Sequence, residues 1–266
     1  MSAPEPPGRP EEPRVELVFE SRSEGAVARL DYRERRLNLV GSAGLAALEN
    51  AFDQLAARPD LRVVVLAGAG GRAFVGGADL AEMATLEPAS ARCFITRLHG
   101  VCERIRALPV PVVARIEGYC LGAGLELAAC CDLRLASTEA RFGMPEVRVG
   151  IPSVIEAALL PRLIGIGRAQ DLVLTGRTLE AREAHRIGLV DGLAADSAAL
   201  DALVEERVGE LLAGAPAALA DQKELIRSWQ ELPLSAAVEA GIDAFERSWR
   251  TEEPRDRMRA FLARKR

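Results

Sequence analysis

The sequence predicts an α/β fold with a helical C-terminal extension. Between residues 62 and 136, apolar strand-like runs alternate with a glycine-rich turn and a segment of helical periodicity. After Pro152 the pattern becomes helical only. Hydrophobic residues make up 49% and charged residues 27% of the 266 positions, as expected of a globular protein with a sizeable core. Because no sharp linker divides the chain, we expect one core over residues 15–199 and a helical region over residues 200–266.

The N-terminal segment divides into a tail and a hairpin. Residues 1–14 are rich in proline and lack an apolar centre, so they resemble neither a secretory signal nor a transit peptide, and we expect a disordered tail. Residues 15–19 and 26–32 are apolar-rich runs separated by Ser-Arg-Ser-Glu-Gly, a pattern typical of a β-hairpin.

Apolar periodicity and Gly or Pro stops define the following elements. The core is expected to contain strands at residues 62–67, 111–116 and 132–136, and helices at residues 45–55, 89–108 and 122–131. The remainder is expected to contain helices at residues 153–160, 168–175, 180–185, 200–213, 217–229, 234–249 and 254–266. Long terminal helices often pack on a neighbouring subunit, and we expect that role here.

Charge and cysteine usage exclude several classes of function. The net charge of −5 and pI of about 5.4 do not favour binding to nucleic acid or to an anionic membrane surface. No apolar run is long enough to span a bilayer. Five cysteines without a CxxC pair predict reduced, mostly buried thiols in a cytoplasmic protein. His99 and His185 are far apart and lack a ligand-like spacing, so no metal site is expected.

Two glutamates near glycine-bearing turns are the candidate catalytic groups. Gly122-Ala-Gly-Leu-Glu126 is expected to open a helix, whose free N–H groups can hold a developing negative charge. Glu146 follows the proline-stiffened turn Phe-Gly-Met-Pro. Two carboxylates beside backbone donors suit proton chemistry next to a carbonyl. Taken singly, Glu126 is equally readable as a first-turn helix acid and Glu146 as a surface loop acid.

A second turn, residues 73–79, offers another backbone donor. Ala78 supplies an N–H, and Asp79 is placed to cap the helix that follows, although a plain capped loop explains the segment equally well. The glycines of residues 68–71 only partly imitate a dinucleotide-binding fingerprint, because no helix follows them directly. His185, before a glycine stop, is interpreted as structural.

Several motifs in order resemble the enoyl-CoA hydratase/isomerase (crotonase) superfamily from about residue 15 to residue 266. The matching segments are residues 36–39, 62–67, 73–80, 118–132, 142–146, 160–165, 188–191 and 258–262. The resemblance implies a spiral of ββα units whose C-terminal helices mediate homotrimers that often pair into hexamers. It also implies an acyl-CoA thioester as substrate, with no further cofactor.

The resemblance assigns roles by motif matching. The N–H groups of Ala78 and Ala123 would form an oxyanion hole for an enolate. Glu126 would act as the base for attack of water at C3 of a trans-2-enoyl-CoA, and Glu146 would protonate C2, giving a 3-hydroxyacyl-CoA. The substrate-binding positions carried over are Arg35, Leu37, Gly77, Ala78, Asp79, Leu80, Gly122 and Ala123.

Alternatives remain on the same scaffold. A Δ3-Δ2-enoyl-CoA isomerase would not need Glu126, and a non-catalytic acyl-CoA-binding protein would not need both glutamates. Val154 stands where dienoyl isomerases and hydroxyacyl-CoA hydrolases carry a further acid. After Pro152 the usual glycine-rich stretch is replaced, which should reshape the acyl pocket and leaves chain length open; Glu156 there is interpreted as a first-turn helix acid. Ala81 lacks the basic side chain of many relatives, and Arg35 is a candidate substitute.

Overall fold

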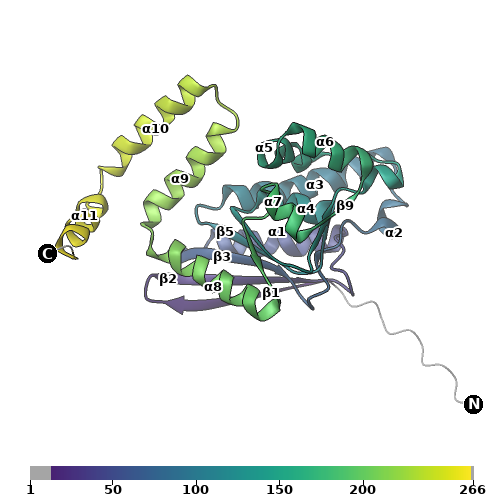
Figure 1. Cartoon of the computed structure of the whole chain (residues 1–266), viewed down its shortest axis with the longest axis horizontal. Coiled ribbons are helices and arrows are strands. Elements are labelled where there is room, and N and C mark those ends of the chain that lie inside the picture. Colours follow the sequence, from purple (N-terminus) through teal and green to yellow (C-terminus); the bar gives the residue numbers. More distant parts are fainter. Residues whose placement is uncertain (1–12, 265–266) are drawn as a thin grey trace, which may run out of the picture.

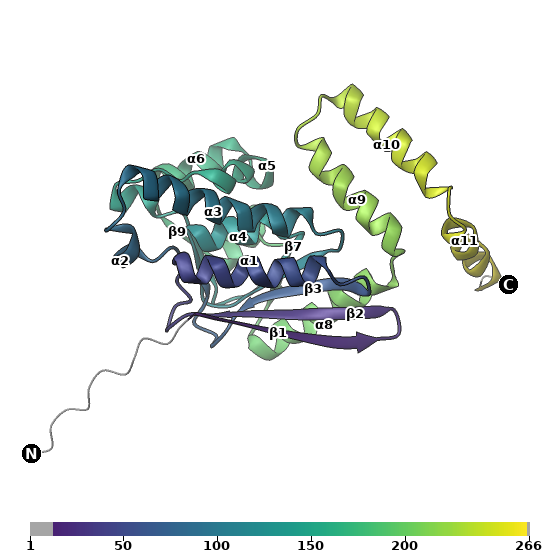
Figure 2. The same ribbon diagram turned by 180° about the vertical axis from the view of Figure 1, so that it is seen from behind.

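The computed structural model describes residues 13–264 and contains two sheets, a group of covering helices and a helical arm (Figures 1 and 2). Residues 1–12 of the predicted tail lie outside the described residues, and the first strand already begins at Arg14. The strands are β1 (Arg14–Arg22), β2 (Gly25–Arg33), β3 (Leu61–Gly68), β4 (Ala73–Val75), β5 (Val112–Ile116), β6 (Tyr119–Leu121), β7 (Leu133–Ser137), β8 (Arg141–Gly143), β9 (Thr178–Glu180) and β10 (Gly192–Ala194).

Most helices follow the predicted order with small shifts of their ends. The helices at Glu146–Val149 and Leu160–Ile164 were not predicted, and the helix predicted over residues 153–160 is mainly a 3₁₀ helix at Ile155–Leu159. The helices are α1 (Ser42–Ala56), α2 (Leu80–Met83), α3 (Pro88–Ala107), α4 (Ala123–Cys130), the 3₁₀ helices η1 (Glu146–Val149) and η2 (Ile155–Leu159), α5 (Leu160–Ile164), α6 (Ile166–Thr175), α7 (Ala181–Arg186), α8 (Ser197–Ala213), α9 (Pro216–Trp229), α10 (Leu234–Ser248) and α11 (Glu253–Arg264).

The larger sheet has the order β1-β2-β3-β5-β7-β10. The predicted hairpin is confirmed, because β1 and β2 pair antiparallel with Arg22 opposite Gly25. All the other pairs in this sheet are parallel, since each crossover passes through at least one helix. Apolar residues alternate between its faces: Ala28 and Leu30 pack toward α1 and α3, whereas Val27 and Val63 pack under α8.

The smaller sheet, β4-β6-β8-β9, was not predicted, and β9 and β10 contradict the prediction that only helices follow Pro152. Each of these strands is three residues long, which is too short for an alternating apolar pattern to be visible in the sequence. β9 pairs antiparallel with β8, and β10 pairs parallel with β7, so long-range pairing defines them rather than local propensity.

Close backbone packing joins the smaller sheet to α4. A Cβ added at Gly124 would lie 2.1 Å from the carbonyl oxygen of Val75, and one added at Gly118 would lie 2.0 Å from that of Arg72. Glycine at these two positions therefore lets β4 lie directly against the first turn of α4 and against the start of β6.

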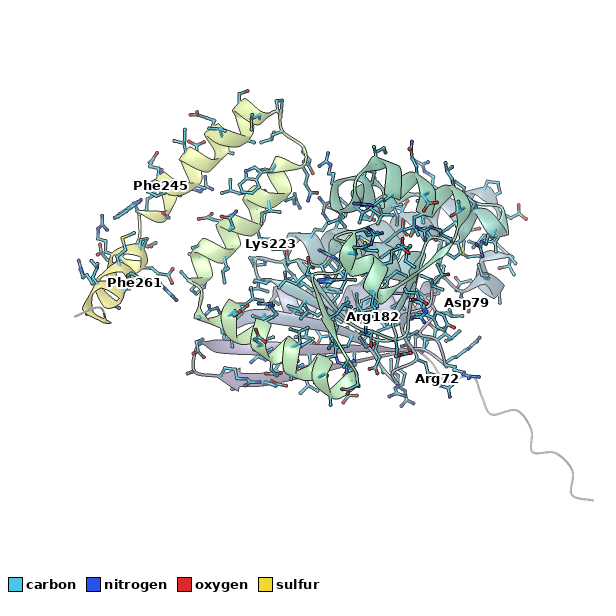
Figure 3. All side chains as sticks on the ribbon, in the orientation of Figure 1. Arg72, Asp79, Arg182, Lys223, Phe245 and Phe261 are labelled. Carbon is cyan, nitrogen blue, oxygen red and sulfur yellow. The ribbon has the colours of Figure 1, made fainter. Side chains whose placement is uncertain are left out.

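The C-terminal helices divide into two groups. α8 belongs to the core, because Leu200, Val204 and Val208 are buried against the outer face of the larger sheet. α9, α10 and α11 project from the body as an arm (Figures 1 and 2). One buried cation ties the arm down: Lys223 of α9 donates to the Ile105 and Val110 carbonyl oxygens and pairs with Asp132 at 2.8 Å (Figure 3).

Candidate active site

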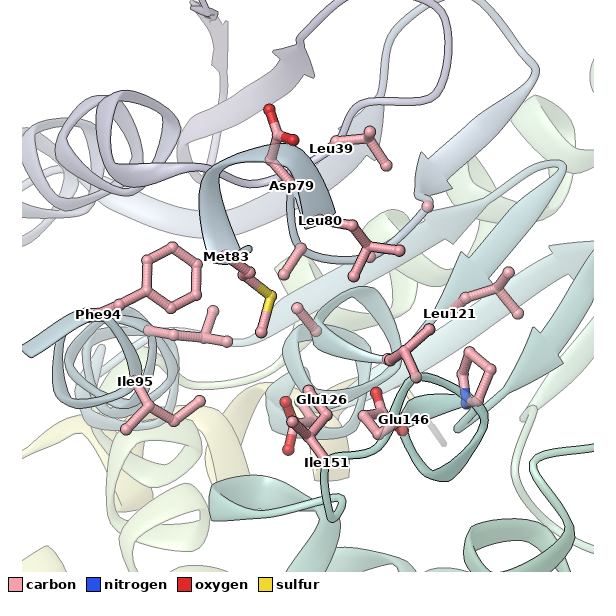
Figure 4. A pocket seen from close by; sticks show the side chains of 18 of the residues that line it. Leu39, Asp79, Leu80, Met83, Phe94, Ile95, Leu121, Glu126, Glu146 and Ile151 are labelled. Carbon is pink, nitrogen blue, oxygen red and sulfur yellow. The ribbon is translucent and has the colours of Figure 1, made fainter. Parts of the chain in front are cut away.

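A largely apolar pocket of about 570 Å³ lies where the turn between β4 and α2 meets α3, α4 and η1 (Figure 4). Its walls are contributed by the apolar side chains of Leu39, Leu80, Met83, Phe94, Ile95, Leu98, Leu121, Val149, Ile151 and Val154. Glu126 and Glu146 reach the same region of this pocket, although they come from elements twenty residues apart (Figure 4). A concave apolar site with a few convergent polar groups is the usual form of a small-molecule binding site.

Glu126 lies at the end of the first turn of α4, as predicted, but it is buried rather than solvated. Only 5% of its surface is exposed. Burial raises the pKa of Glu126 to about 8; the Ala157 N–H that donates to its Oε1 at 3.2 Å lowers the pKa, and the charges of Glu146 and Glu156 raise it further. Near neutral pH this side chain therefore holds a proton.

Glu146 begins η1 and is partly exposed in the pocket. Its Oε2 accepts a hydrogen bond from Ser153 Oγ at 2.7 Å. A Cβ added at Gly122 would lie 2.4 Å from its Oε1, and Gly122 has φ +51°, so only glycine allows this carboxylate to sit over the start of α4. Ser153 was missed by sequence reasoning, because a serine in a loop carries no signal of its partner.

Ala78 and Ala123 both line the pocket. A β-bridge joins Val40 to the β4–α2 turn: the Val40 N–H donates to the Gly77 carbonyl oxygen, and the Asp79 N–H donates to the Val40 carbonyl oxygen. The Ala78 N–H, between them, takes no part in this bridge. Ala123 is the first residue of α4, where N–H groups have no partner within the helix. Within residues 13–264, no protein hydrogen bond engages either of these two N–H groups.

The remaining predicted binding positions surround this region, with one exception. Arg35, Gly77, Asp79, Leu80 and Gly122 all line the pocket. Asp79 caps α2 as predicted, accepting from the N–H groups of residues 81 and 82. Leu37 is not among the lining residues: it is 37% exposed, and its carbonyl oxygen accepts from the Gly76 N–H.

Two further charged groups near the pocket were not assigned a role from sequence. Arg148 lines the pocket together with Arg35, so two guanidinium groups are present at this site. Glu156 is in the first turn of η2, as interpreted, but it is 4% exposed and pairs with His99, with 2.7 Å between Oε1 and Nδ1. A sequence pattern does not reveal the contact between Glu156 and His99, because α3 and η2 meet only in the folded chain.

The thiols and histidines have mostly structural surroundings. Cys102, Cys120, Cys130 and Cys131 are buried free thiols, while Cys93 is exposed. His185 lies in the last turn of α7 and bonds the Val190 carbonyl oxygen at 2.9 Å. Donor atoms of Cys102, Cys130 and Glu156 lie within 4.8 Å of one another, a juxtaposition that the spacing of these residues did not reveal.

Comparison with known proteins gives the family. A sequence profile described as Enoyl-CoA hydratase/isomerase matches residues 22–266. The chain belongs to this family. It is 33% identical over 247 residues to the short-chain-enoyl-CoA hydratase of Clostridium acetobutylicum, covering 92% of this chain and 94% of the relative. It is 37% identical over 173 residues to the cyclohexa-1,5-dienecarbonyl-CoA hydratase of Thauera aromatica, covering 65% of this chain and 66% of that one.

Solved structures of the enoyl-CoA hydratase/isomerase family confirm the crotonase fold. The crystal structure of enoyl-CoA hydratase from Bacillus anthracis superposes with a TM-score of 0.87 at 31% identity, covering 93% of this chain and 96% of that one. The predicted family and fold are thus confirmed. Among residues 13–264, no helix combines the length and the apolar character needed to cross a bilayer.

Proposed function

We propose that this protein is an enoyl-CoA hydratase, which adds water across a trans-2-enoyl-CoA to give a 3-hydroxyacyl-CoA. One observation carries the proposal: Glu126 and Glu146 reach one pocket that also presents two backbone N–H groups without a protein partner. An isomerase that moves a double bond would need only one of these acids. The Clostridium and Thauera relatives, both named hydratases, support the same reaction class.

The backbone donors are proposed to stabilise the negative charge of the reaction. When water attacks C3, electron density moves through the double bond onto the thioester oxygen and forms an enolate. The N–H groups of Ala78 and Ala123 would bind that oxygen; removing one such donor from an oxyanion hole costs about 10²–10³-fold in rate. Because backbone atoms do this work, alanine serves as well as glycine at position 123.

The two carboxyl groups are proposed to move the protons as a pair that holds one proton. One carboxylate accepts a proton from the attacking water, and one carboxyl group donates a proton to C2, so that the pair keeps its proton count. The resemblance implied Glu126 as the base. The raised pKa of Glu126 and the hydrogen bond from Ser153 to Glu146 favour the opposite direction: Glu126 donates to C2 and Glu146 accepts from water.

The pocket walls fit the two chemically different parts of such a substrate. Met83, Phe94 and Ile95 provide apolar surface for the acyl chain. Arg35 and Arg148 provide positive charge for the phosphates of coenzyme A. The two hydratase relatives are named for different acyl groups. The resemblance therefore does not identify the acyl group that this protein accepts, and an assay with several acyl-CoAs is needed to do so.

We further propose that the arm joins copies of this chain into a trimer. Leu234, Val238, Ile242 and Phe245 follow each other at helical spacing along α10 and are each more than half exposed. A contiguous exposed apolar stripe of this kind marks a protein–protein contact. Pairing of trimers into hexamers is an extension of the same proposal.

The test is loss of the enoyl thioester absorbance with crotonyl-CoA and longer trans-2-enoyl-CoAs, with the 3-hydroxyacyl product confirmed. Glu126→Gln and Glu146→Gln should each lower kcat by about 10²–10⁴-fold while acyl-CoA binding persists. Near-normal hydration by both variants would refute the paired mechanism. Turnover of 3-enoyl-CoA that survives Glu126→Gln would instead identify an isomerase.

A further inference from the structure

An acid–imidazole pair lies outside the pocket on the far side of Glu126. Glu156 Oε1 is 2.7 Å from Nδ1 of His99, whose side chain is 47% exposed. Glu156 itself is 4% exposed, and within the described chain its Oε2 has no hydrogen-bond partner. An unpartnered oxygen on a buried acid is costly, so this arrangement calls for an explanation beyond packing.

The pair is joined to Glu126 through η2. The next residue after Glu156, Ala157, donates its N–H to Glu126 Oε1 at 3.2 Å. His99 belongs to α3, and its contact with Glu156 anchors η2 at the place where that N–H meets the catalytic acid. His99 directly follows Leu98, which lines the pocket from α3.

We propose, resting on the hydratase function above, that His99 and Glu156 form a positioning pair: their contact holds the Ala157 N–H against Glu126 Oε1, fixes the orientation of that acid and places the charge of Glu156 beside it. A negative charge at Glu156 opposes ionisation of Glu126, while the N–H fixes which oxygen of Glu126 is free to face the substrate. His99 reaches solvent and prevents the Glu156 carboxylate from being both buried and wholly unpaired.

The electrostatic surroundings support this role. Burial is the largest cause of the raised pKa of Glu126, and the charge of Glu156 adds to the effect of Glu146. The elements that pack around η2 and Glu126 carry further titratable or charged groups. They are Arg92, Cys93, Arg97, His99, Cys102, Glu103, Arg104 and Arg106 on α3, Cys130 on α4, Glu146 and Arg148 on η1, and Arg162 on α5. A carboxylate oxygen of Glu103 lies within 4.8 Å of ligand atoms of both His99 and Glu156, so Glu103 belongs to the same cluster even though Arg106 binds it at 2.7 Å. Glu210 on α8, which pairs with Arg207, is therefore the control acid.

The deciding experiment titrates the Glu126 carboxyl by carbon NMR in the full-length protein, with its signal assigned by Glu126→Gln. This measurement needs no turnover, so its outcome is separate from that of the hydratase assay. The isosteric Glu156→Gln keeps the acceptor for His99 and removes the charge. It should move the titration midpoint of Glu126 downward by about half a pH unit, whereas Glu210→Gln, on the surface of α8, should leave the midpoint in place.

A second variant approaches the pair from its exposed side. His99→Leu removes the anchor and should lower kcat by about 10-fold with little change in KM, since the orientation of Glu126 is lost. His99→Asn, which keeps an N–H near the position of Nδ1, should restore most of the loss. The proposal would be overturned if the titration midpoint of Glu126 were unchanged in Glu156→Gln. It would also be overturned if kcat fell as far in His99→Asn as in His99→Leu. Stoichiometric zinc that disappears in Cys102→Ser would overturn it as well, because Glu156 would then be a metal ligand.

Discussion

The pocket-forming core and the helical arm use apolar residues in opposite ways. All eight residues of α4 are buried, including the acid Glu126. α9 has no fully buried residue, and α10 buries only Ala237 and Ala244 although its stripe of large apolar side chains is exposed. Phe245, labelled in Figure 3, is 67% exposed. The core thus buries its apolar residues within one chain, whereas the arm has an apolar surface that the chain itself leaves exposed.

This difference separates two kinds of function. In α4 the cost of burying Glu126 is balanced by the surrounding fold, and the consequence is a carboxyl group that keeps its proton. In the arm the large apolar side chains of α10 are exposed instead, and that surface chemistry fits association. Changes in the core should therefore alter catalysis without altering assembly, and changes in the arm should first alter assembly.

The largest effect is expected from Gly122→Ala, which tests the core alone. The added Cβ would meet Glu146 Oε1 at 2.4 Å, and φ +51° strains any L side chain, so the catalytic carboxylate must move. A displacement of this size should lower kcat/KM by about 10²-fold. Gly209→Ala, in open space on α8, is the matched control and should be neutral. Equal activity in both variants would show that Glu146 need not sit over Gly122.

The next effect tests the arm alone. Phe245→Asp places a charge in the exposed stripe of α10 and should weaken subunit association by about 10–10²-fold, because a large apolar side chain loses its burial. Light scattering after size exclusion measures the change. Glu239→Ser, on the same helix, is the control and should keep the wild-type mass. A monomeric wild type would contradict the proposed trimer outright.

The pH profile distinguishes the direction of proton transfer in the core. Below about pH 8 Glu126 is protonated, and above it the carboxyl ionises. If Glu126 donates to C2, kcat/KM should fall about tenfold per unit above that pH; if it is the base, the rate should rise through the same range. Rate measurements with crotonyl-CoA between pH 6 and pH 10 decide between the two. The oligomeric mass across this range serves as the control.

The smallest expected effect concerns the joint between core and arm. Lys223→Met removes a cation that is 10% exposed, takes the donor from two backbone carbonyl groups and leaves Asp132 with the Val112 N–H as a partner but no cation. The free energy of unfolding should fall by roughly 1–3 kcal/mol, as judged by urea denaturation. Arg207→Met breaks only an exposed pair with Glu210, which solvent screens, and should lower the free energy of unfolding by less than Lys223→Met does. An equal loss of unfolding free energy in both variants would show that contacts other than those of Lys223 hold the arm to the core.

Sequence reasoning reached most of the fold because long elements carry their own signals. The helices later seen as α1 and α3 and the strands β2 and β3 have apolar periodicity and clear glycine or proline ends. The short strands β4, β6, β8, β9 and β10 depend on partners far along the chain, and no local pattern of three residues identifies them.

The candidate site shows the same division between local and non-local information. Glu126, Glu146 and Asp79 were found because each follows a turn of recognisable composition. Ser153 and the contact between His99 and Glu156 were not found, because each joins a loop or 3₁₀ helix to another element. The burial of Glu126 was also missed: a first-turn acid usually faces water, but here α3 and η2 both pack against α4.

The absence of a side chain at Gly124 has a consequence for how this enzyme class can change. Because Val75 packs directly on the backbone of α4, main-chain geometry alone sets the separation between the proposed donors at Ala78 and Ala123. The apolar side chains of the pocket walls, such as Met83, Phe94 and Ile95, can therefore vary without moving these two N–H groups. A new acyl specificity, or even a new reaction through an enolate, can be introduced by side-chain replacement while the anion cradle is inherited unchanged.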